Sequence, residues 1–297
     1  MQNPVPDAPR QTRRPLLLAH LTLLHVPPPE FVSIAAQVGY DGVSLHISQP
    51  ASGVRYPMLG EDSAMLREVL ARLADTGIAV HDIQGVRLYP DTRVADFLPM
   101  FEAGARLGAR YAVTLSDDPD ANRNADRIGE IAALAAPFGI DLVLEFMVYS
   151  GIKTLQDANR LLDQSGAANA QVMVDSLHWH RSGGTLLDIA ETPAARMPYL
   201  QICDAPLATP EGGFEGLRFE ALKQRQFVGE GELPLREFLR AYPGDIAVSV
   251  ETPVTLWHDR MSNLQIAERS IQTTRHFLDA LAAMATNDSS HSSRSST

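Results

Sequence analysis

The sequence contains one cysteine, Cys203, among its 297 residues. A single thiol can form neither an internal disulfide nor a cysteine-cluster zinc site, and this scarcity is typical of a reducing compartment. No apolar run reaches the roughly 18 residues that a membrane-spanning helix needs. The apolar segment 16–24 is short and has no small-residue cleavage site of the signal-peptide kind. These absences predict a cytoplasmic protein that does not engage a membrane.

Cationic side chains are also in the minority, because 25 Lys and Arg stand against 36 Asp and Glu, for a net charge of −11. Such a chain, with no local basic patch, repels nucleic acid, so no nucleic-acid partner is expected. The sequence has no P-loop, no G-x-S-x-G nucleophile elbow and no H-E-x-x-H zinc motif. The expected partner is a small-molecule substrate.

Short apolar runs alternate with amphipathic segments along most of the chain. Gly39, Gly77 and Gly139 follow amphipathic segments, where glycine ends a helix and turns the chain toward the next strand. Helices are predicted, among others, at 94–107, 125–137, 155–164, 235–242 and 261–284. Strands are predicted at 16–24, 42–47, 78–83, 111–115, 142–147, 171–175, 199–203 and 246–251.

Eight strands alternating with helices predict a single α/β domain, a (β/α)8 TIM barrel over residues 16–284. A doubly wound sheet is the alternative, but residues 24–29, after the first strand, contain no glycine for a dinucleotide-binding turn. Residues 1–15 and the serine-rich segment 285–297 are predicted to be disordered tails.

The last four predicted strands each end near an acidic or amide side chain: Glu145, Asp175, Gln201 and Glu251. The carboxyl ends of barrel strands form the catalytic face, so these side chains are expected to converge. Three carboxylates in a partly buried pocket repel one another unless a cation compensates. An all-oxygen ligand set favours Mn²⁺, Mg²⁺ or Co²⁺ over zinc. The alternative is that each acid forms an ion pair or caps the next helix.

Two histidines and two arginines are further candidates. His178, three residues after Asp175, is predicted to contact substrate or transfer a proton, and His180 to bind substrate. An H-x-H zinc pair is the alternative for these histidines, although no cysteine or third histidine lies nearby. Arg87 and Arg225 are predicted to bind a substrate carboxylate or phosphate, with a solvated arginine as the alternative. Cys203 is expected to be a packed thiol.

Read in order, five motifs resemble the xylose isomerase-like TIM-barrel family, also called the sugar phosphate isomerase/epimerase family. They are Glu145, Asp175-x-x-His178, Gln201-x-x-Asp204-Ala-Pro, Gly229-Glu-Gly231-Glu and Val250-Glu251. The resemblance runs from residue 16 to about residue 283. It implies one divalent ion, Mn²⁺, Mg²⁺ or Co²⁺, at positions 145, 175, 201 and 251. It also implies Glu145 and Glu251 as a proton-exchanging pair acting through an enediolate, His178 on a substrate hydroxyl, and a possible homo-oligomer.

Two positions depart from the ketose 3-epimerases of that family, since Gln201 replaces a histidine and Leu207 an arginine. The segments around Gln201, Arg225 and Arg87 are instead similar to bacterial 3-dehydroshikimate dehydratases, although Met147 stands where some of those place a histidine base. Endonuclease IV shares the fold, but its three-zinc cluster does not match this four-residue oxygen site.

We therefore expect a metal-dependent enzyme that abstracts a proton next to a carbonyl of a small polyhydroxylated substrate, of isomerase or epimerase type. A lyase of the dehydratase type is one alternative, and a non-catalytic sugar- or partner-binding barrel is another.

Overall fold

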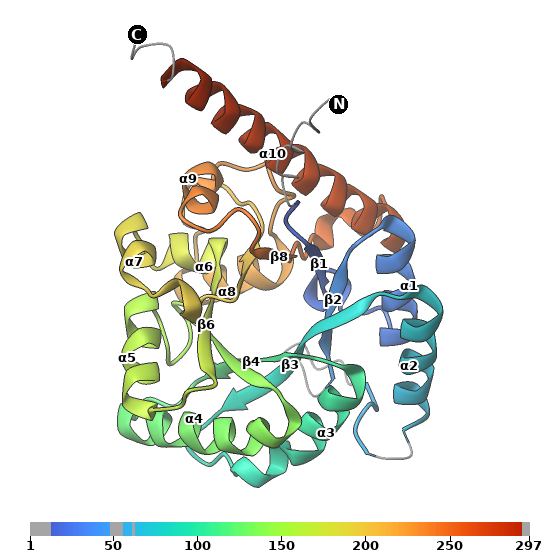
Figure 1. Ribbon diagram of the computed structural model, residues 1–297, viewed down its shortest axis with the longest axis vertical. Coiled ribbons are helices and arrows are strands. Elements are labelled where there is room, and N and C mark those ends of the chain that lie inside the picture. Colours follow the sequence, from blue (N-terminus) through green and yellow to red (C-terminus); the bar gives the residue numbers. More distant parts are fainter. Residues whose placement is uncertain (1–12, 48–55, 61–62, 293–297) are drawn as a thin grey trace, which may run out of the picture.

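The computed structural model describes residues 13–47, 56–60 and 63–292, with side chains up to residue 284. Eight parallel strands close into a barrel in sequence order (Figure 1). They are β1 (Leu16–Ala19), β2 (Gly42–His46), β3 (Ala79–Leu88), β4 (Tyr111–Ser116), β5 (Asp141–Glu145), β6 (Ala170–Asp175), β7 (Tyr199–Ile202) and β8 (Ala247–Val250). The predicted TIM barrel is confirmed.

Helices surround the strands on the outside of the barrel (Figure 1). They are α1 (Pro28–Val38), α2 (Ala64–Thr76), α3 (Leu98–Leu107), α4 (Ala121–Ala135), α5 (Leu155–Ser165), α6 (Ser176–Arg181), α7 (Leu186–Glu191), α8 (Gly213–Lys223), α9 (Leu235–Arg240) and α10 (Asn263–Ser292). Short 3₁₀ turns are η1 (His20–Leu23), η2 (Val94–Phe97), η3 (Ala136–Phe138), η4 (Ala194–Arg196) and η5 (Thr255–Trp257).

Two predicted boundaries differ from the structure at the ends of the domain. The first strand ends at Ala19, and the chain continues into η1. A hydrogen bond of 2.9 Å between Nε2 of His20 and the carbonyl oxygen of Val26 stabilises this turn in place of an extended strand. At the other end, α10 continues to Ser292, so the predicted tail boundary at residue 285 falls inside that helix. Most of the predicted N-terminal tail and residues 293–297 lie outside the described residues.

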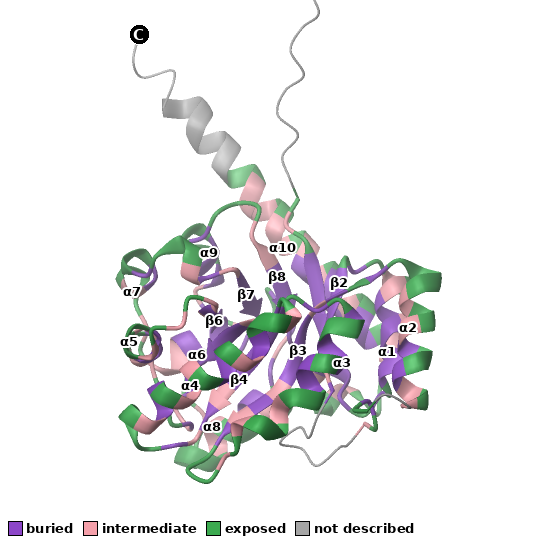
Figure 2. Cartoon of the chain, turned by 60° about the horizontal axis from the view of Figure 1, so that its bottom comes forward, coloured by how far each residue is buried: buried purple, intermediate pink, exposed green. Residues whose placement is uncertain are grey.

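Apolar side chains fill two separate regions. One lies between the strands and the surrounding helices, and the strands are accordingly buried while the helices expose their outer faces (Figure 2). The other is a small cluster of Tyr111, Val113, Val143, Met173 and Tyr199. Every member comes from β4 to β7, and such layers of side chains close the interior of a TIM barrel. The barrel is therefore a packed core, and its chemistry belongs at the strand ends.

Glycines end several helices and set the direction of the chain into the following strand. Gly39 after α1 has φ 86°, and its amide bonds the carbonyls of Ala35 and Ala36. Gly77 after α2 has φ 71°. This left-handed conformation is strained for residues with a Cβ, so glycine is the natural residue here. All eight strands thus run parallel, and their carboxyl ends meet at one face.

Candidate active site and metal centre

Three carboxylates meet at the carboxyl ends of the strands. Glu145 is the last residue of β5, Asp175 the last of β6, and Glu251 directly follows β8. One oxygen atom of each lies within 4.8 Å of the others, and all three residues are buried. The expected convergence of these strand ends is therefore present.

Gln201 of β7 belongs to the same cluster. It pairs in register with Asp175, is 1% exposed, and donates a side-chain hydrogen bond to Glu251. Its carbonyl oxygen, Oε1, is buried and has no hydrogen-bond partner among the described residues. A buried acceptor without a donor is costly, and a cation ligated by that oxygen would remove the cost. The donor set of three carboxylates and one amide oxygen therefore fits a hard divalent cation.

Asp175 both caps a helix and forms an ion pair, the two roles that the sequence offered as alternatives to metal binding. Its Oδ1 atom caps α6, accepting hydrogen bonds from the amides of Leu177 at 2.8 Å and His178 at 3.0 Å. Its Oδ2 atom is 2.7 Å from Nη1 of Arg225. Burial alone would raise the pKa of this carboxyl, but Arg225 and the α6 amide outweigh burial and lower the pKa. Asp175 is therefore ionised and rigidly held.

Arg225 supplies an internal positive charge. Its guanidinium is buried, with Nη1 on Asp175 and Nη2 2.9 Å from Oε2 of Glu251. Its Nε atom donates to the carbonyl of Ala221 at 2.8 Å. The solvated alternative for Arg225 is therefore wrong. When all three carboxyls are ionised, they and the guanidinium carry a net charge of −2, which one divalent cation would balance.

The loop that contains Arg225 is held in place by hydrogen bonds to Asp204. The backbones of Asp204 and Gln226 exchange two hydrogen bonds of 3.0 and 2.7 Å, which tie the residue after Arg225 to the end of β7. The Asp204 carboxylate accepts from the amides of Gly229 and Leu233, each at 3.0 Å. A Cβ at Gly231 would lie 2.4 Å from Asp204 Oδ1, so only glycine fits there. The Gly229 to Gly231 segment is thus a tight turn held by the Asp204 carboxylate.

Burial and mutual repulsion change the protonation of the two glutamates. Burial, followed by the charges of Glu251 and Asp175, raises the pKa of Glu145 well above its usual value. Burial also raises the pKa of Glu251, to about 7, although Arg225 opposes it. His178 Nε2 lies 3.9 Å from Glu145 Oε1, and burial lowers the pKa of this imidazole to about 4. A neutral histidine therefore stands beside Glu145, and in the metal-free site both glutamates have raised pKa values.

A cavity of about 100 Å³ opens above this cluster. Of the sequence-predicted residues, it is lined by Arg87, Glu145, His178, Arg225 and Glu251. His180 is not among its lining residues, because side chains two positions apart on a helix point in different directions. Within the described residues, the structure thus separates His180 from the candidate site and does not support the H-x-H zinc pair. Cys203 is buried, burial raises the pKa of its thiol, and it packs as expected.

Several lining residues were not singled out from the sequence. Tyr149, four residues after Glu145, stacks edge-on against His178 with ring centroids 5.7 Å apart. Arg218 of α8 also lines the cavity, and Arg87 is held by Asp117 at 2.6 Å. Asp117 follows β4, so the pattern of polar residues at strand ends could have identified it. Arg218 carried no such signal, because it lies in a helix inserted between β7 and β8.

Comparison with known proteins agrees with this architecture. The family model described as xylose isomerase-like TIM barrel matches residues 32–278. The chain belongs to this xylose isomerase-like TIM-barrel family.

Three individual proteins of known structure or activity share 16–22% sequence identity with this chain. Inosose isomerase of Bacillus velezensis is 22% identical over 200 residues, which cover 64% of this chain and 68% of that protein. The crystal structure of IolI protein with a binding zinc atom has a TM-score of 0.74 at 17% identity, over 90% of this chain and 98% of that one. An L-ribulose 3-epimerase structure has a TM-score of 0.70 at 16% identity, over 93% and 98% of the two chains. These structural likenesses establish the fold.

No helix in the described part of the chain combines the length and the apolar character that crossing a bilayer demands.

Proposed function

We propose that this protein is a divalent-metal-dependent isomerase or epimerase of a small, polyhydroxylated, sugar-like substrate. The observation that carries the proposal is the buried cluster of Glu145, Asp175 and Glu251 beside the unpartnered amide oxygen of Gln201. These four residues would hold Mn²⁺ or Mg²⁺, with Co²⁺ also suited to the site. A divalent ion bound there would polarise a substrate carbonyl and acidify the neighbouring C–H bond.

Glu145 and Glu251 are the proposed acid/base pair. They come from β5 and β8, so the substrate can be approached from two directions across the barrel mouth. One carboxylate takes the C–H proton, and the electron pair left behind delocalises as an enediolate of the substrate. Return of a proton to the other face gives the epimer, and return to the adjacent carbon gives the isomer. Burial raises the pKa of both carboxyls in the metal-free site, and a bound divalent cation would lower it again and keep a carboxylate available to accept the proton.

The surrounding residues orient the reacting groups. Arg225 pairs with one oxygen of Asp175 and one of Glu251, and so fixes both carboxylates at the base of the site. Neutral His178 is positioned to hydrogen-bond a substrate hydroxyl beside Glu145. Arg87, held by Asp117, is positioned at the wall of the cavity to bind a polar or anionic part of the substrate.

Solvent deuterium exchange tests the proposal. The protein, supplied with Mn²⁺, Mg²⁺ or Co²⁺, is incubated in D₂O with a panel of ketoses and inososes, and deuterium in the recovered sugar is measured by mass spectrometry. Glu145→Gln and Glu251→Gln should each slow exchange by at least about 100-fold, the usual loss when a positioned base is removed. Glu102→Gln, an exposed change in α3, is the matched control.

Two results would refute the proposal. One is exchange by Glu145→Gln within tenfold of the wild type. The other is elemental analysis showing no divalent metal retained by the purified, metal-supplied protein. A non-catalytic sugar-binding barrel predicts no exchange by the wild type, no bound metal, and a ligand affinity unchanged by Glu145→Gln.

A lyase reaction is the second candidate, favoured by the arginines Arg87 and Arg218 in the cavity wall, which suit an acidic substrate. Here the same proton abstraction is followed by loss of a hydroxyl from the neighbouring carbon. Incubation with 3-dehydroshikimate and Mn²⁺ distinguishes the two, because the dehydratase product protocatechuate absorbs in the ultraviolet. Absorbance growth without deuterium exchange in ketoses would favour the lyase.

A further inference from the structure

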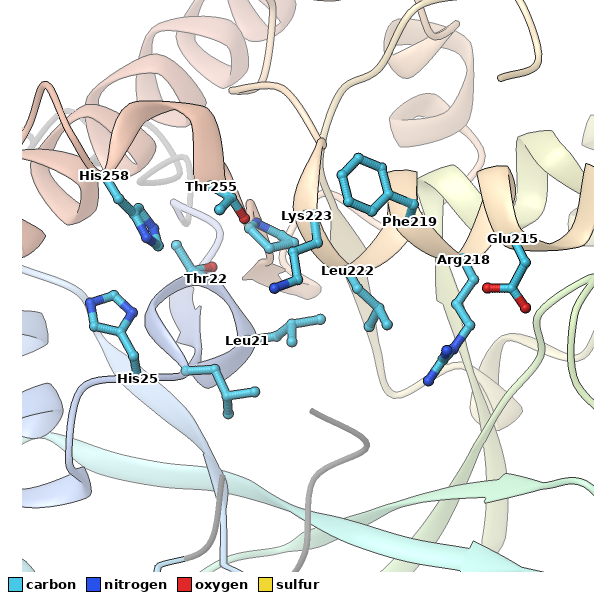
Figure 3. Close-up of a pocket in the computed structure, with 12 residues that line it drawn as sticks. Leu21, Thr22, His25, Glu215, Arg218, Phe219, Leu222, Lys223, Thr255 and His258 are labelled. Carbon is cyan, nitrogen blue, oxygen red and sulfur yellow. The ribbon is translucent and has the colours of Figure 1, made fainter. Parts of the chain in front are cut away.

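A second, larger cavity lies next to the candidate active site. It has a volume of about 470 Å³ and lies between the segment around η1, helix α8 and the segment after β8 (Figure 3). Leu21, Leu24, Arg218 and Leu222 line both this outer cavity and the catalytic cavity. The two are therefore adjacent compartments with a common wall, and a ligand can extend from one into the other.

The outer cavity is lined by an unusual number of basic side chains. Arg218 and Lys223 extend into it from α8, while His25 and His258 stand together at the opposite side (Figure 3). The His25 and His258 ring centroids are 4.8 Å apart. Glu215 is the only carboxylate among its described lining residues. Lys223 is also one of just two lysines in a chain whose net charge is −11.

These cations are not neutralised within the protein. In the described part of the chain, no ion pair joins Arg218 or Lys223 to an acid, whereas most of the paired arginines elsewhere contact Asp or Glu at 3.6 Å or less. Burial lowers the pKa of His258, and the charges of His25 and Lys223 lower it further, while Asp259 opposes them. Arg218 and Lys223, unpaired within the described residues, give the cavity a positive potential, which a bound anion would relieve.

The cavity also has an apolar part that suits the body of a ligand. Leu21, Leu24 and Leu222 form the wall shared with the catalytic cavity. Arg218 and Leu222 are four residues apart on α8 and therefore share one face of that helix. Carbon atoms of a ligand can thus pass along the leucines while a terminal anion reaches the basic side chains.

We propose that the outer cavity binds an anionic group, a carboxylate or a phosphate, at the end of the substrate remote from its reacting carbonyl. This inference rests on the proposed function of the neighbouring site and narrows its substrate class to acidic or phosphorylated sugar-like compounds. Lys223 and Arg218 bind the anion, and His25 and His258 complete the far side of the subsite.

Protection of Lys223 from chemical modification tests the subsite directly. The full-length, metal-supplied protein is methylated with formaldehyde and borohydride, and the modification of each lysine is quantified by peptide mass spectrometry. Inorganic phosphate or glycolate at 10 mM should slow modification of Lys223 at least threefold. Lys153 is exposed and lines neither cavity, so its rate should not change and it serves as a control within the same molecule.

The outcomes separate the ligand classes. Protection by phosphate alone assigns a phosphorylated substrate, protection by glycolate alone assigns a carboxylated one, and protection by both establishes a general anion subsite. Protection by neither anion, or equal slowing at Lys153, overturns the inference. This readout does not depend on turnover, so protected Lys223 without deuterium exchange would refute the proposed function and leave the anion subsite standing.

A variant adds a second measurement. Once exchange into sugars is established, Lys223→Gln should raise the KM for a phosphorylated or carboxylated sugar, relative to its neutral parent, by at least tenfold. Lys153→Gln is the matched control and should leave this ratio unchanged. An unchanged ratio in Lys223→Gln would show that Lys223 does not recognise the anion.

Discussion

Removing the charge of Arg225 is the sharpest test of how the carboxylate cluster is held together. Arg225→Gln deletes a buried cation that lies 2.7 Å from Asp175 and 2.9 Å from Glu251. Deleting one partner of a buried ion pair leaves an uncompensated charge and typically costs about 3–5 kcal/mol. We expect a loss of this size in the free energy of unfolding of the metal-free protein at pH 8.

The loss should shrink at lower pH, because a carboxyl that has lost its partner can bind a proton instead. Without Arg225 the folded-state pKa of Glu251 rises further above its unfolded-state value, and that of Asp175 changes from lowered to raised, because burial is no longer opposed by the guanidinium. Below its unfolded-state pKa, a carboxyl with a raised folded-state pKa is protonated in both states and does not reduce the free energy of unfolding. As the pH rises from the unfolded-state pKa to the folded-state pKa, the unfolded state loses its proton first, and the free energy of unfolding falls. For an unfolded pKa near 4.3, this caps the cost per group at about 5 kcal/mol at pH 8 and about 2 kcal/mol at pH 6.

Urea unfolding of wild type and variant at pH 6 and pH 8, with a chelator and then with Mn²⁺, measures these effects. Saturating Mn²⁺ should recover part of the loss, since the ion supplies the missing positive charge. The control is Arg72→Gln, whose exposed pair with Glu68 at 3.6 Å is worth about 0.5 kcal/mol or less. A loss under 1 kcal/mol at pH 8, or one independent of pH, would refute Arg225 as the counter-charge of the cluster.

Three further changes test other parts of the structure. Burial raises the pKa of Asp82 to about 7. The unfolded state therefore ionises first, and the free energy of unfolding of the wild type should fall as the pH rises from about 4 to about 7. In a pH series of urea unfolding curves, Asp82→Asn should remove up to about 4 kcal/mol of that fall. Gln201→His replaces an oxygen donor with nitrogen and should shift metal preference toward zinc over Mn²⁺ by at least tenfold, measured by competition calorimetry; an unchanged ratio would place Gln201 outside the ligand set. Gly231→Ala would force a Cβ to 2.4 Å from Asp204 and should cost about 1–3 kcal/mol, against no loss for Gly244→Ala, which meets nothing within 4 Å.

The local sequence pattern was sufficient for the barrel and for the acidic residues of the site. Apolar runs and helix-ending glycines recur with a regular alternation, and this alternation alone predicts parallel strands whose carboxyl ends share one face. Glu145, Asp175 and Glu251 were visible because each is a charged residue at the end of an apolar strand. Their convergence followed from the topology without any knowledge of side-chain positions.

Contacts between distant parts of the chain could not be predicted in the same way. Arg225 pairs with Asp175, 50 residues away in the sequence. The Arg225 guanidinium is buried because Asp204 holds the loop that carries it. His180 turned away from the site because α6 begins at Ser176, which the helical patterns of the sequence did not indicate. The outer basic cavity likewise exists only because folding brings α8 opposite His25 and His258. Periodicity is a property of neighbouring residues, whereas charge pairing and cavities depend on where separate elements pack.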